Sequence, residues 1–247
     1  MPSPLTIVHL GRVPYREAWD LQRKLQRELI EGHGKDTLIL CEHEPVITLG
    51  RGAKPENVLG TPEDLAKRGI EVLAIERGGD VTYHGPGQLV GYPIIDLNRQ
   101  RRDVGWYMRS IEEVILRSLS QWGIPATRID GKTGVWIKSQ QYNTAPNCVN
   151  SAPDRKIAAL GVRISRWCTL HGFALNVLSC KEGFALINPC GFVDIEVTSI
   201  EEESTLRSTP CMTEVEDAVV RHFFEVFSFE TGNDMMHSEA TPLAKQE

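Results

Sequence analysis

Strand-like runs separated by turns recur along the chain, and three long amphipathic helix patterns interrupt them. The helix patterns span residues 14–29, 106–122 and 213–226, with a capping-box pattern at Thr213–Glu216 opening the last. A further short helix is predicted between its cap at Thr61 and Gly69. The strand-like runs are residues 5–10, 36–43, 45–50, 71–76, 88–97, 134–138, 156–165 and 169–178. Helices mixed with hairpin-like strand pairs favour an α+β fold, a single domain of mixed or antiparallel sheets flanked by helices.

The length of 247 residues and a hydrophobic content of 41% are enough for a full core without disulfide or metal staples. The polar segment between Lys138 and Lys156 contains two prolines and is typical of a loop. We therefore expect one domain over residues 1–230, with residues 139–155 as an inserted loop. Residues 231–247 are expected to form a flexible C-terminal tail.

Charge and cysteine usage exclude several classes of protein. The formal net charge of −6 disfavours a non-specific nucleic-acid binder. No apolar run approaches the roughly 18 residues that a membrane helix needs, and the amino terminus lacks a signal or transit pattern. We therefore expect a cytoplasmic protein that contacts neither nucleic acid nor membrane. The six cysteines include no C-x-x-C pair, so neither a zinc ribbon nor a disulfide framework is expected.

The densest functional pattern is RGGDVTYHGPGQ, residues 77–88, between two strand-like runs. Glycines allow the backbone to approach a ligand closely, and backbone N–H groups in such a loop can bind an anionic or carbonyl oxygen. Arg77, Thr82, His84 and Gln88 add polar side chains at close spacing. A plain Gly- and Pro-rich hairpin turn is the alternative interpretation. The pattern is neither a P-loop nor a dinucleotide fingerprint.

Three later segments carry further candidates: KIAALGVRI (156–164), HGFALNV (171–177) and INPCG (187–191). A lysine at a strand start is usually an exposed residue, and a single histidine is more often structural than catalytic. Cys190 lies in a tight turn between Pro189 and Gly191 and is a better nucleophile candidate than the cysteines in apolar strands. An inert cysteine remains the alternative for each of them.

Together these four segments resemble the lipoate-biosynthesis octanoyltransferases, or lipoyl(octanoyl) transferases. Residues 77–88 match the pattern R-G-G-x-x-T-[FY]-H-x-P-G-Q of that family, and the K-I-A-A-x-G, H-G-x-A-L-N-V and P-C-G segments follow in the same order. The resemblance covers roughly residues 5–205. It implies a fold similar to the catalytic domain of biotin and lipoate protein ligases.

The resemblance also implies roles for individual residues. Cys190 would be the acyl-accepting nucleophile and Lys156 its catalytic partner. The substrate contacts would fall on Arg77, Gly78, Gly79, Asp80, Val81, Thr82, Tyr83, His84, Ala159, Leu160, Gly161, His171, Gly172, Phe173 and Ala174. No cofactor and no metal site is implied.

The implied reaction moves an octanoyl group from octanoyl-acyl carrier protein to a lysine of a lipoyl domain through a cysteine thioester. The implied acceptors are the lipoyl domains of 2-oxoacid dehydrogenase complexes and the glycine cleavage H protein. The basic run Arg99, Arg101 and Arg102 is a candidate docking site for the acidic carrier protein, or simply a solvated loop. The alternatives are an ATP-dependent lipoate or biotin protein ligase, which needs no cysteine nucleophile, and a non-catalytic acyl or lipoyl-domain binding protein.

Overall fold

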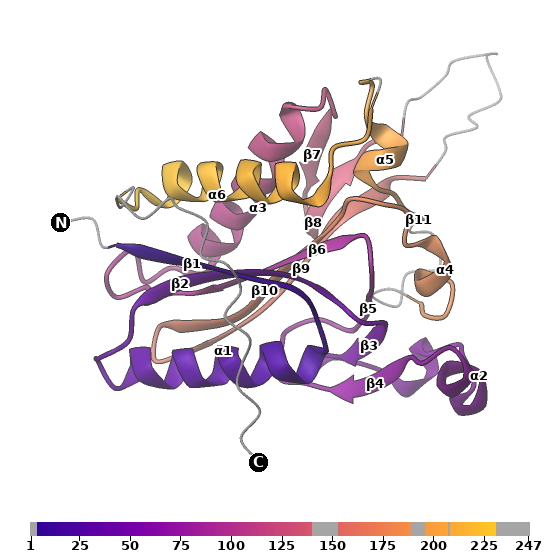
Figure 1. The fold of residues 1–247 in the computed structure, drawn as a ribbon, viewed down its shortest axis with the longest axis horizontal. Coiled ribbons are helices and arrows are strands. Elements are labelled where there is room, and N and C mark those ends of the chain that lie inside the picture. Colours follow the sequence, from indigo (N-terminus) through magenta and orange to yellow (C-terminus); the bar gives the residue numbers. More distant parts are fainter. Residues whose placement is uncertain (1–3, 140–152, 189–195, 207, 231–247) are drawn as a thin grey trace.

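The computed structural model of the protein describes residues 4–139, 153–188, 196–206 and 208–230. Eight strands of this part form one large mixed sheet in the order β1-β2-β6-β10-β9-β8-β7, with β11 paired to β9 (Figure 1). Only the β1/β2 and β11/β9 pairs in this sheet are parallel. The strand bounds are β1 Leu5–Val13, β2 Asp36–His43, β6 Gln88–Ile94, β7 Ala126–Ile129, β8 Lys132–Ile137, β9 Arg155–Ser165, β10 Cys168–Asn176 and β11 Glu196–Val197.

A small second sheet lies beside the large one in the order β4-β3-β5. It consists of β3 (Val46–Leu49), β4 (Glu71–Ala74) and β5 (Val81–His84), with β3 parallel to β4 and antiparallel to β5. The 3₁₀ helix η1 (Pro55–Asn57) and helix α2 (Pro62–Lys67) connect β3 to β4. The Thr61 side chain accepts a hydrogen bond from the Asp64 backbone at 3.2 Å, which caps α2 as the sequence predicts.

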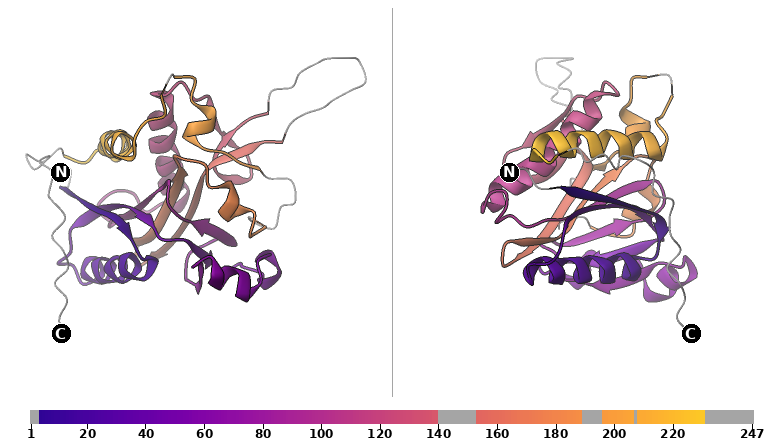
Figure 2. Two further views of the ribbon diagram at one scale, coloured as in Figure 1. Left: turned by 45° about the vertical axis from the view of Figure 1, so that its right-hand side comes forward. Right: turned by 60° about the vertical axis from the view of Figure 1, so that its left-hand side comes forward.

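Helices cover both faces of the large sheet. Helix α1 (Tyr15–Ile30) lies on one face, and α3 (Val104–Ser120) and α6 (Met212–Phe227) lie on the other (Figures 1 and 2). Successive residues of β2 alternate between the two cores, as strand geometry requires: Leu38 and Leu40 pack on the α3/α6 side, and Ile39 and Cys41 pack on the α1 side. The short helices α4 (Lys181–Phe184) and α5 (Ile200–Glu203) flank β11.

The predicted α+β class, the three long helices and most of the strands are confirmed. The last helix begins at Met212, one residue earlier than predicted, because Cys211 is its N-cap and its backbone N–H donates to Glu214 Oε2 at 2.7 Å. The capping box therefore lies at Cys211–Glu214, two residues before the predicted Thr213–Glu216. The predicted tail and most of the inserted loop lie outside the described residues. No helix in the described ranges is long and apolar enough to cross a membrane.

Candidate active site

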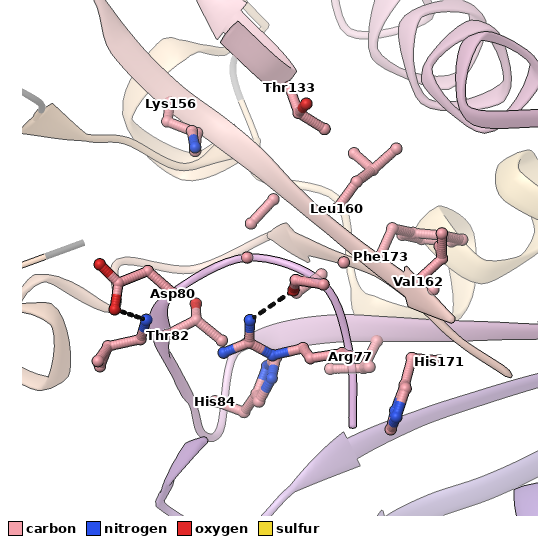
Figure 3. A pocket seen from close by; sticks show the side chains of 18 of the residues that line it. Arg77, Asp80, Thr82, His84, Thr133, Lys156, Leu160, Val162, His171 and Phe173 are labelled. Carbon is pink, nitrogen blue, oxygen red and sulfur yellow. Dashed lines mark hydrogen bonds between the residues drawn. The ribbon is translucent and has the colours of Figure 1, made fainter. Parts of the chain in front are cut away.

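A cavity of about 700 Å³ opens where β8 turns away from β9. The two strands pair only between Val135–Ile137 and Arg155–Ala158, and beyond Ala158 the Gly-rich segment approaches β9 instead. The Gly78 N–H donates to the Val162 carbonyl at 3.0 Å. Figure 3 shows the result: the loop passes beside β9, with Lys156 toward one end of the strand and Val162 toward the other. The cavity is therefore a split in the large sheet that the Gly-rich loop closes on one side.

Arg77 fixes the start of that loop. Its buried guanidinium donates to the Thr48 carbonyl at 2.7 Å, to Thr48 Oγ1 at 3.0 and 3.2 Å, and to the Gly78 carbonyl at 3.0 Å. Gly161 makes room for it, because a Cβ there would lie 3.1 Å from both Arg77 Cδ and the Gly78 oxygen. Gly79 has a φ of +86°, which glycine adopts without strain. These contacts explain why the loop needs both its arginine and its glycines.

The other residues of the loop and of β5 differ in whether they line the cavity. Thr82 and His84 line the cavity, as do Asp80 and Val81. The Asp80 carboxylate accepts from Asn57 Nδ2 at 2.6 Å and from the backbone of Lys54 and Val81, so it also holds the loop in place. Tyr83 is the exception among the predicted contacts: its ring packs against Phe184 of α4 in the core beside the second sheet, and Tyr83 is not among the described lining residues.

The two remaining predicted contact segments lie side by side. In the antiparallel pair of β9 and β10, Ala159 is opposite Ala174, Leu160 opposite Phe173, and Gly161 opposite Gly172. All six residues line the cavity, and so does His171. A Cβ on Gly172 would lie 2.1 Å from the Gly91 carbonyl oxygen, so this glycine allows close packing of β10 on β6.

Buried aromatic and histidine side chains form the α1 side of the cavity. Tyr15 stacks on His84 with ring centroids 5.9 Å apart, and His43 lies 5.9 Å from His84. Burial lowers the pKa of His84 to about 3 and that of His43 to about 4. Burial also lowers the pKa of His171. The three imidazoles are therefore neutral near pH 7 and can act as donors or acceptors but not as cations.

Lys156 projects from β9 into the cavity wall. Its Nζ lies 4.5 Å from the centroid of the buried Trp136 ring, which is a cation–π contact. Val197 of β11 is the strand partner of Lys156 and also lines the cavity. The Thr198 N–H donates to the Lys156 carbonyl at 3.0 Å, so β11 holds the lysine backbone in place.

The predicted nucleophile Cys190 lies outside the described residues. Before it, the Asn188 N–H donates to the Asn57 carbonyl at 2.8 Å, and after it β11 pairs beside Lys156. Cys41, Cys168 and Cys180 are buried. Burial raises the pKa of Cys168 and of Cys180 to about 11, which disfavours the reactive thiolate at both. Within the described ranges, no group of three His, Cys, Asp or Glu side chains could hold a metal ion.

Two of the candidate docking arginines contact acceptors of their own segment of the chain. Arg101 pairs with Asp103 at 3.0 Å, and Arg102 Nε donates to Asn98 Oδ1 at 2.7 Å. Arg99 lies 3.7 Å from the carboxylate of the buried Asp36 and has a structural contact there. None of the three is among the described lining residues, so their part in docking stays a prediction.

Several lining residues were not among the predicted contacts: Tyr15, Val90, Tyr92, Met108, Thr133, Trp136 and Asn176. Asn176 stands inside the quoted segment HGFALNV, and that polar residue in an apolar strand was the available signal. The others come from helices and strands whose apolar patterns indicate only core packing. Their place in the cavity depends on long-range pairing that local sequence does not reveal.

Comparison with known proteins finds relatives that match most of the chain. The family profile of the lipoyl protein ligase A/B catalytic domain matches residues 14–224. An octanoyltransferase of Chloroflexus aggregans is 44% identical over 230 residues, which cover 93% of this chain and 97% of that protein. An octanoyltransferase of Myxococcus xanthus is 47% identical over 229 residues, covering 92% of this chain and 61% of that protein.

Among solved structures, the bi-partite lipoate protein ligase of Thermoplasma acidophilum has a similar fold. The TM-score is 0.62 at 17% identity, and the alignment covers 96% of this chain and 88% of that one. At this identity the likeness concerns the fold alone, and it confirms the predicted lipoate-ligase-like architecture. Together with the family profile and the sequence relatives, it shows that the chain belongs to the octanoyltransferase family of acyltransferases, built on a lipoyl protein ligase A/B catalytic domain.

Proposed function

We propose that this chain moves an octanoyl group from octanoyl-acyl carrier protein to a lysine of a lipoyl domain, with Cys190 as the covalent acyl carrier. The observation that carries the proposal is the meeting of separate sequence segments around one cavity. The Gly-rich loop, the β9 segment and the β10 segment all line it, and Lys156 stands in its wall. The choice of octanoyl as the acyl group rests on the relatives named octanoyltransferase.

The first half of the reaction forms the acyl-enzyme. The Cys190 thiolate attacks the carbonyl carbon of the donor thioester, a new C–S bond forms, and the bond to the carrier sulfur breaks. The ammonium of Lys156 gives its proton to the leaving thiolate and becomes neutral. A thioester is already activated, so this scheme consumes no ATP.

The second half restores both residues. The neutral amine of the acceptor lysine attacks the acyl carbon, an amide C–N bond forms, and the bond to the Cys190 sulfur breaks. Lys156 takes the proton that the attacking nitrogen loses, and Cys190 leaves as the thiolate. The pair therefore ends the cycle in the protonation state in which it began.

The β9 backbone supplies a candidate donor for the tetrahedral oxyanion. The Val162 carbonyl points away from β10, since it accepts from Gly78. Peptide groups two residues apart on a strand point the same way, so the Leu160 N–H points to this side as well, and the Gly161 N–H points toward β10. Between the two, Leu160 is the better candidate for the oxyanion site. Such a donor typically contributes about 3 kcal/mol of barrier lowering.

Small residues leave space for the acyl tail. Ala159, Gly172 and Ala174 line the cavity together with the apolar Leu160 and Phe173. Burial of an alkyl chain contributes about 0.8 kcal/mol per CH₂ group, so most of the affinity for the donor would come from the tail. The proposed acceptors are the lipoyl domains of 2-oxoacid dehydrogenase complexes and the glycine cleavage H protein.

The test is intact-protein mass after mixing the full chain with octanoyl-acyl carrier protein in the absence of ATP. We expect one hydroxylamine-labile octanoyl adduct on the native chain and on Cys211→Ala, which removes an exposed thiol. We expect none on Cys190→Ala. An adduct that persists on Cys190→Ala would reject that residue as the carrier. Octanoate transfer that appears only with ATP would assign the chain to the ligase class instead.

A further inference from the structure

A chain of buried polar groups runs from His84 in the cavity wall to the backbone of Thr198. His84 Nδ1 lies 2.6 Å from Gln88 Oε1, and Gln88 Nε2 lies 2.9 Å from Asn176 Oδ1. Asn176 Nδ2 in turn lies 2.9 Å from the Thr198 carbonyl oxygen. All four residues are at most 7% exposed, so water does not compete for these bonds. The reaction steps above give Gln88 and Asn176 no role.

The donor and the acceptor of every hydrogen bond in this series follow from its last group, the Thr198 carbonyl. A backbone carbonyl can only accept, so the Asn176 atom beside Thr198 is the amide nitrogen and the Asn176 oxygen faces Gln88. Gln88 must therefore donate with its nitrogen, which also lies 3.4 Å from the Tyr83 carbonyl. The Gln88 oxygen is left to accept from His84 Nδ1. Two backbone carbonyls thus fix both amides.

His84 consequently carries its hydrogen on Nδ1. Burial lowers the pKa of His84 to about 3, and the nearby His43 and Arg77 act in the same direction, so the ring is neutral and has a single N–H. Nε2 is then an acceptor with a lone pair. It makes no hydrogen bond to any residue that the structure describes. The His84 ring lines the cavity. Both ring nitrogens of His171 are buried without a hydrogen-bond partner, whereas Nε2 of His84 is not among such buried atoms.

We propose that Gln88 and Asn176 are positioning residues that hold His84 as its Nδ1–H tautomer and so present Nε2 to the cavity as an acceptor for a substrate N–H group. A carbonyl or carboxylate oxygen has no hydrogen to offer this nitrogen and would not bind there. Under the proposed function, two substrate parts carry an N–H: the amides of the carrier's pantetheine arm and the amine of the acceptor lysine. The identity of the N–H ligand rests on the proposed function, whereas the tautomer of His84 rests on the hydrogen bonds alone.

Thr198 links this series of hydrogen bonds to Lys156, the proposed catalytic partner of Cys190. Its carbonyl accepts from Asn176, and its N–H donates to the Lys156 carbonyl at 3.0 Å. Its hydroxyl donates to Glu203 Oε1 at 2.7 Å, and Arg155 holds that carboxylate with two bonds of 2.7 and 2.9 Å. The same residue therefore anchors the orientation of His84 and the backbone of Lys156.

The test is magnetic resonance of the histidine ring nitrogens in the full chain labelled with isotope-enriched histidine, with the His84 signals assigned from His84→Gln. His43 is an internal reference, because its Nδ1 lies 3.1 Å from the Val13 carbonyl and its Nε2 lies 2.7 Å from the Tyr92 hydroxyl. We expect a single Nδ1–H tautomer for His84 at pH 7. An Nε2–H tautomer, a mixture of both or a protonated ring would overturn the proposal.

The variant Asn176→Leu isolates the anchor. Without the Asn176 oxygen, Gln88 loses its short donor contact and can rotate its amide, so His84 should show both tautomers. The His43 signals should stay as they are, which also shows that the variant folds. A folded Asn176→Leu chain in which His84 keeps a pure Nδ1–H tautomer would remove Asn176 from the proposal. The native measurement remains decisive if this variant fails to fold.

Two additions identify the N–H donor. S-octanoyl-pantetheine and an isolated lipoyl domain are titrated separately into the native chain, and the His84 Nε2 signal is followed. A shift with the first assigns the donor to the pantetheine amides, and a shift with the second assigns it to the acceptor lysine. No shift with either overturns Nε2 as a ligand-binding atom. These signals need no turnover, so a failed octanoyl transfer would overturn the proposed function alone.

Discussion

Val197 lies directly opposite Lys156 in the parallel pair of β11 and β9, and both side chains line the same cavity. The pairing is completed by the Thr198 N–H, which donates to the Lys156 carbonyl. A lysine at the start of a long strand would ordinarily extend into solvent. Here a two-residue strand fixes its backbone, and the Trp136 ring lies beneath its ammonium. The lysine is therefore held at the cavity from two sides.

Lys156→Arg should separate the two half-reactions. Arginine keeps the positive charge but is not deprotonated in proteins, so it cannot accept the proton of the acceptor amine. We expect the transfer step to slow by about 10²–10⁴-fold, with a smaller loss in formation of the acyl-enzyme. Single-turnover rates of each half-reaction measure this, with Lys138→Arg at an exposed position as the control. Equal rates in the native chain and Lys156→Arg would contradict the assigned role.

Arg77→Lys should destabilise the fold and not only weaken substrate binding. The guanidinium makes bonds to Thr48 and Gly78 at 2.7–3.2 Å, and an ammonium cannot reproduce that planar set. The cost of leaving the buried Thr48 acceptors unsatisfied is about 1–3 kcal/mol. Urea unfolding of Arg77→Lys and of the exposed Arg51→Lys provides the comparison. If both variants unfold at the native midpoint, the Thr48 contacts contribute nothing to stability.

Gly172→Ala should be destabilising because the new Cβ meets backbone. It would lie 2.1 Å from the Gly91 oxygen and 2.7 Å from Pro93 Cδ, so β10 and β6 would have to separate. Overpacking of this kind costs about 1–3 kcal/mol, and a backbone clash belongs at the upper end. Gly52→Ala is the matched control, since the nearest atom to its Cβ would be 3.4 Å away. Thermal unfolding should place Gly172→Ala well below Gly52→Ala, and a native-like midpoint would refute the clash.

The buried histidines should make the protein less stable in mild acid. Their folded pKa values, about 4 for His43 and about 3 for His84, lie below the unfolded value of 6.5. The neutral rings therefore contribute their full stability above about pH 6.5, and this is lost as pH falls toward the folded values. Each histidine costs up to about 1.4 kcal/mol per pH unit in that window.

Unfolding free energies between pH 7.5 and pH 4.5 check this expectation. The variant His84→Gln has no imidazole at that position, so its stability should fall less steeply with acid than that of the native chain. A native curve that stays flat across the window, or a variant with the same slope, would show that the rings do not remain neutral in the folded state.

Reversal of Arg101 and Arg102 tests the carrier-protein docking surface. The contacts of Arg101 with Asp103 and of Arg102 with Asn98 lie at the surface, so Arg101→Glu with Arg102→Glu should leave the fold intact. Arg99 is kept because it faces the buried Asp36. We expect the double variant to lose far more activity with octanoyl-acyl carrier protein than with a small octanoyl thioester. Equal losses on the two donors would assign this run to the solvated surface.

The elements that sequence could predict are those with a strong local pattern. The periodic apolar residues of α1 and α3 predicted both helices, and the Thr61 cap predicted α2. Strand β5 was missed inside the Gly-rich segment, because its four residues are defined by pairing with β3, from Val46 opposite His84 onward. Strands β7 and β11 were missed for the same reason, since short strands depend on distant partners.

The candidate site divides in a similar way. The motif residues could be selected from the sequence because glycine, histidine and lysine stood in patterns that resemble a family. Local sequence could not predict which way each of these side chains points. Tyr83 and His84 are neighbours in the motif, but strand alternation places Tyr83 in the core beside the second sheet and His84 in the cavity wall. Likewise, Gln88 belonged to the motif, but its bond to Asn176 joins residues 88 positions apart.

The divergence of β8 from β9 opens a binding volume whose lining includes residues of both helix-covered cores, such as Phe173 from one and Tyr92 from the other. The turn and strand start at residues 131–133 also line the cavity, and there Gly131 has a φ of +77° and no atom within 4 Å of a Cβ position. Under the proposed function, this short surface hairpin, which belongs to neither core, bounds part of the space for the acyl tail. Selection on tail length could act on that hairpin alone, so substrate preference and folding can evolve separately in this architecture.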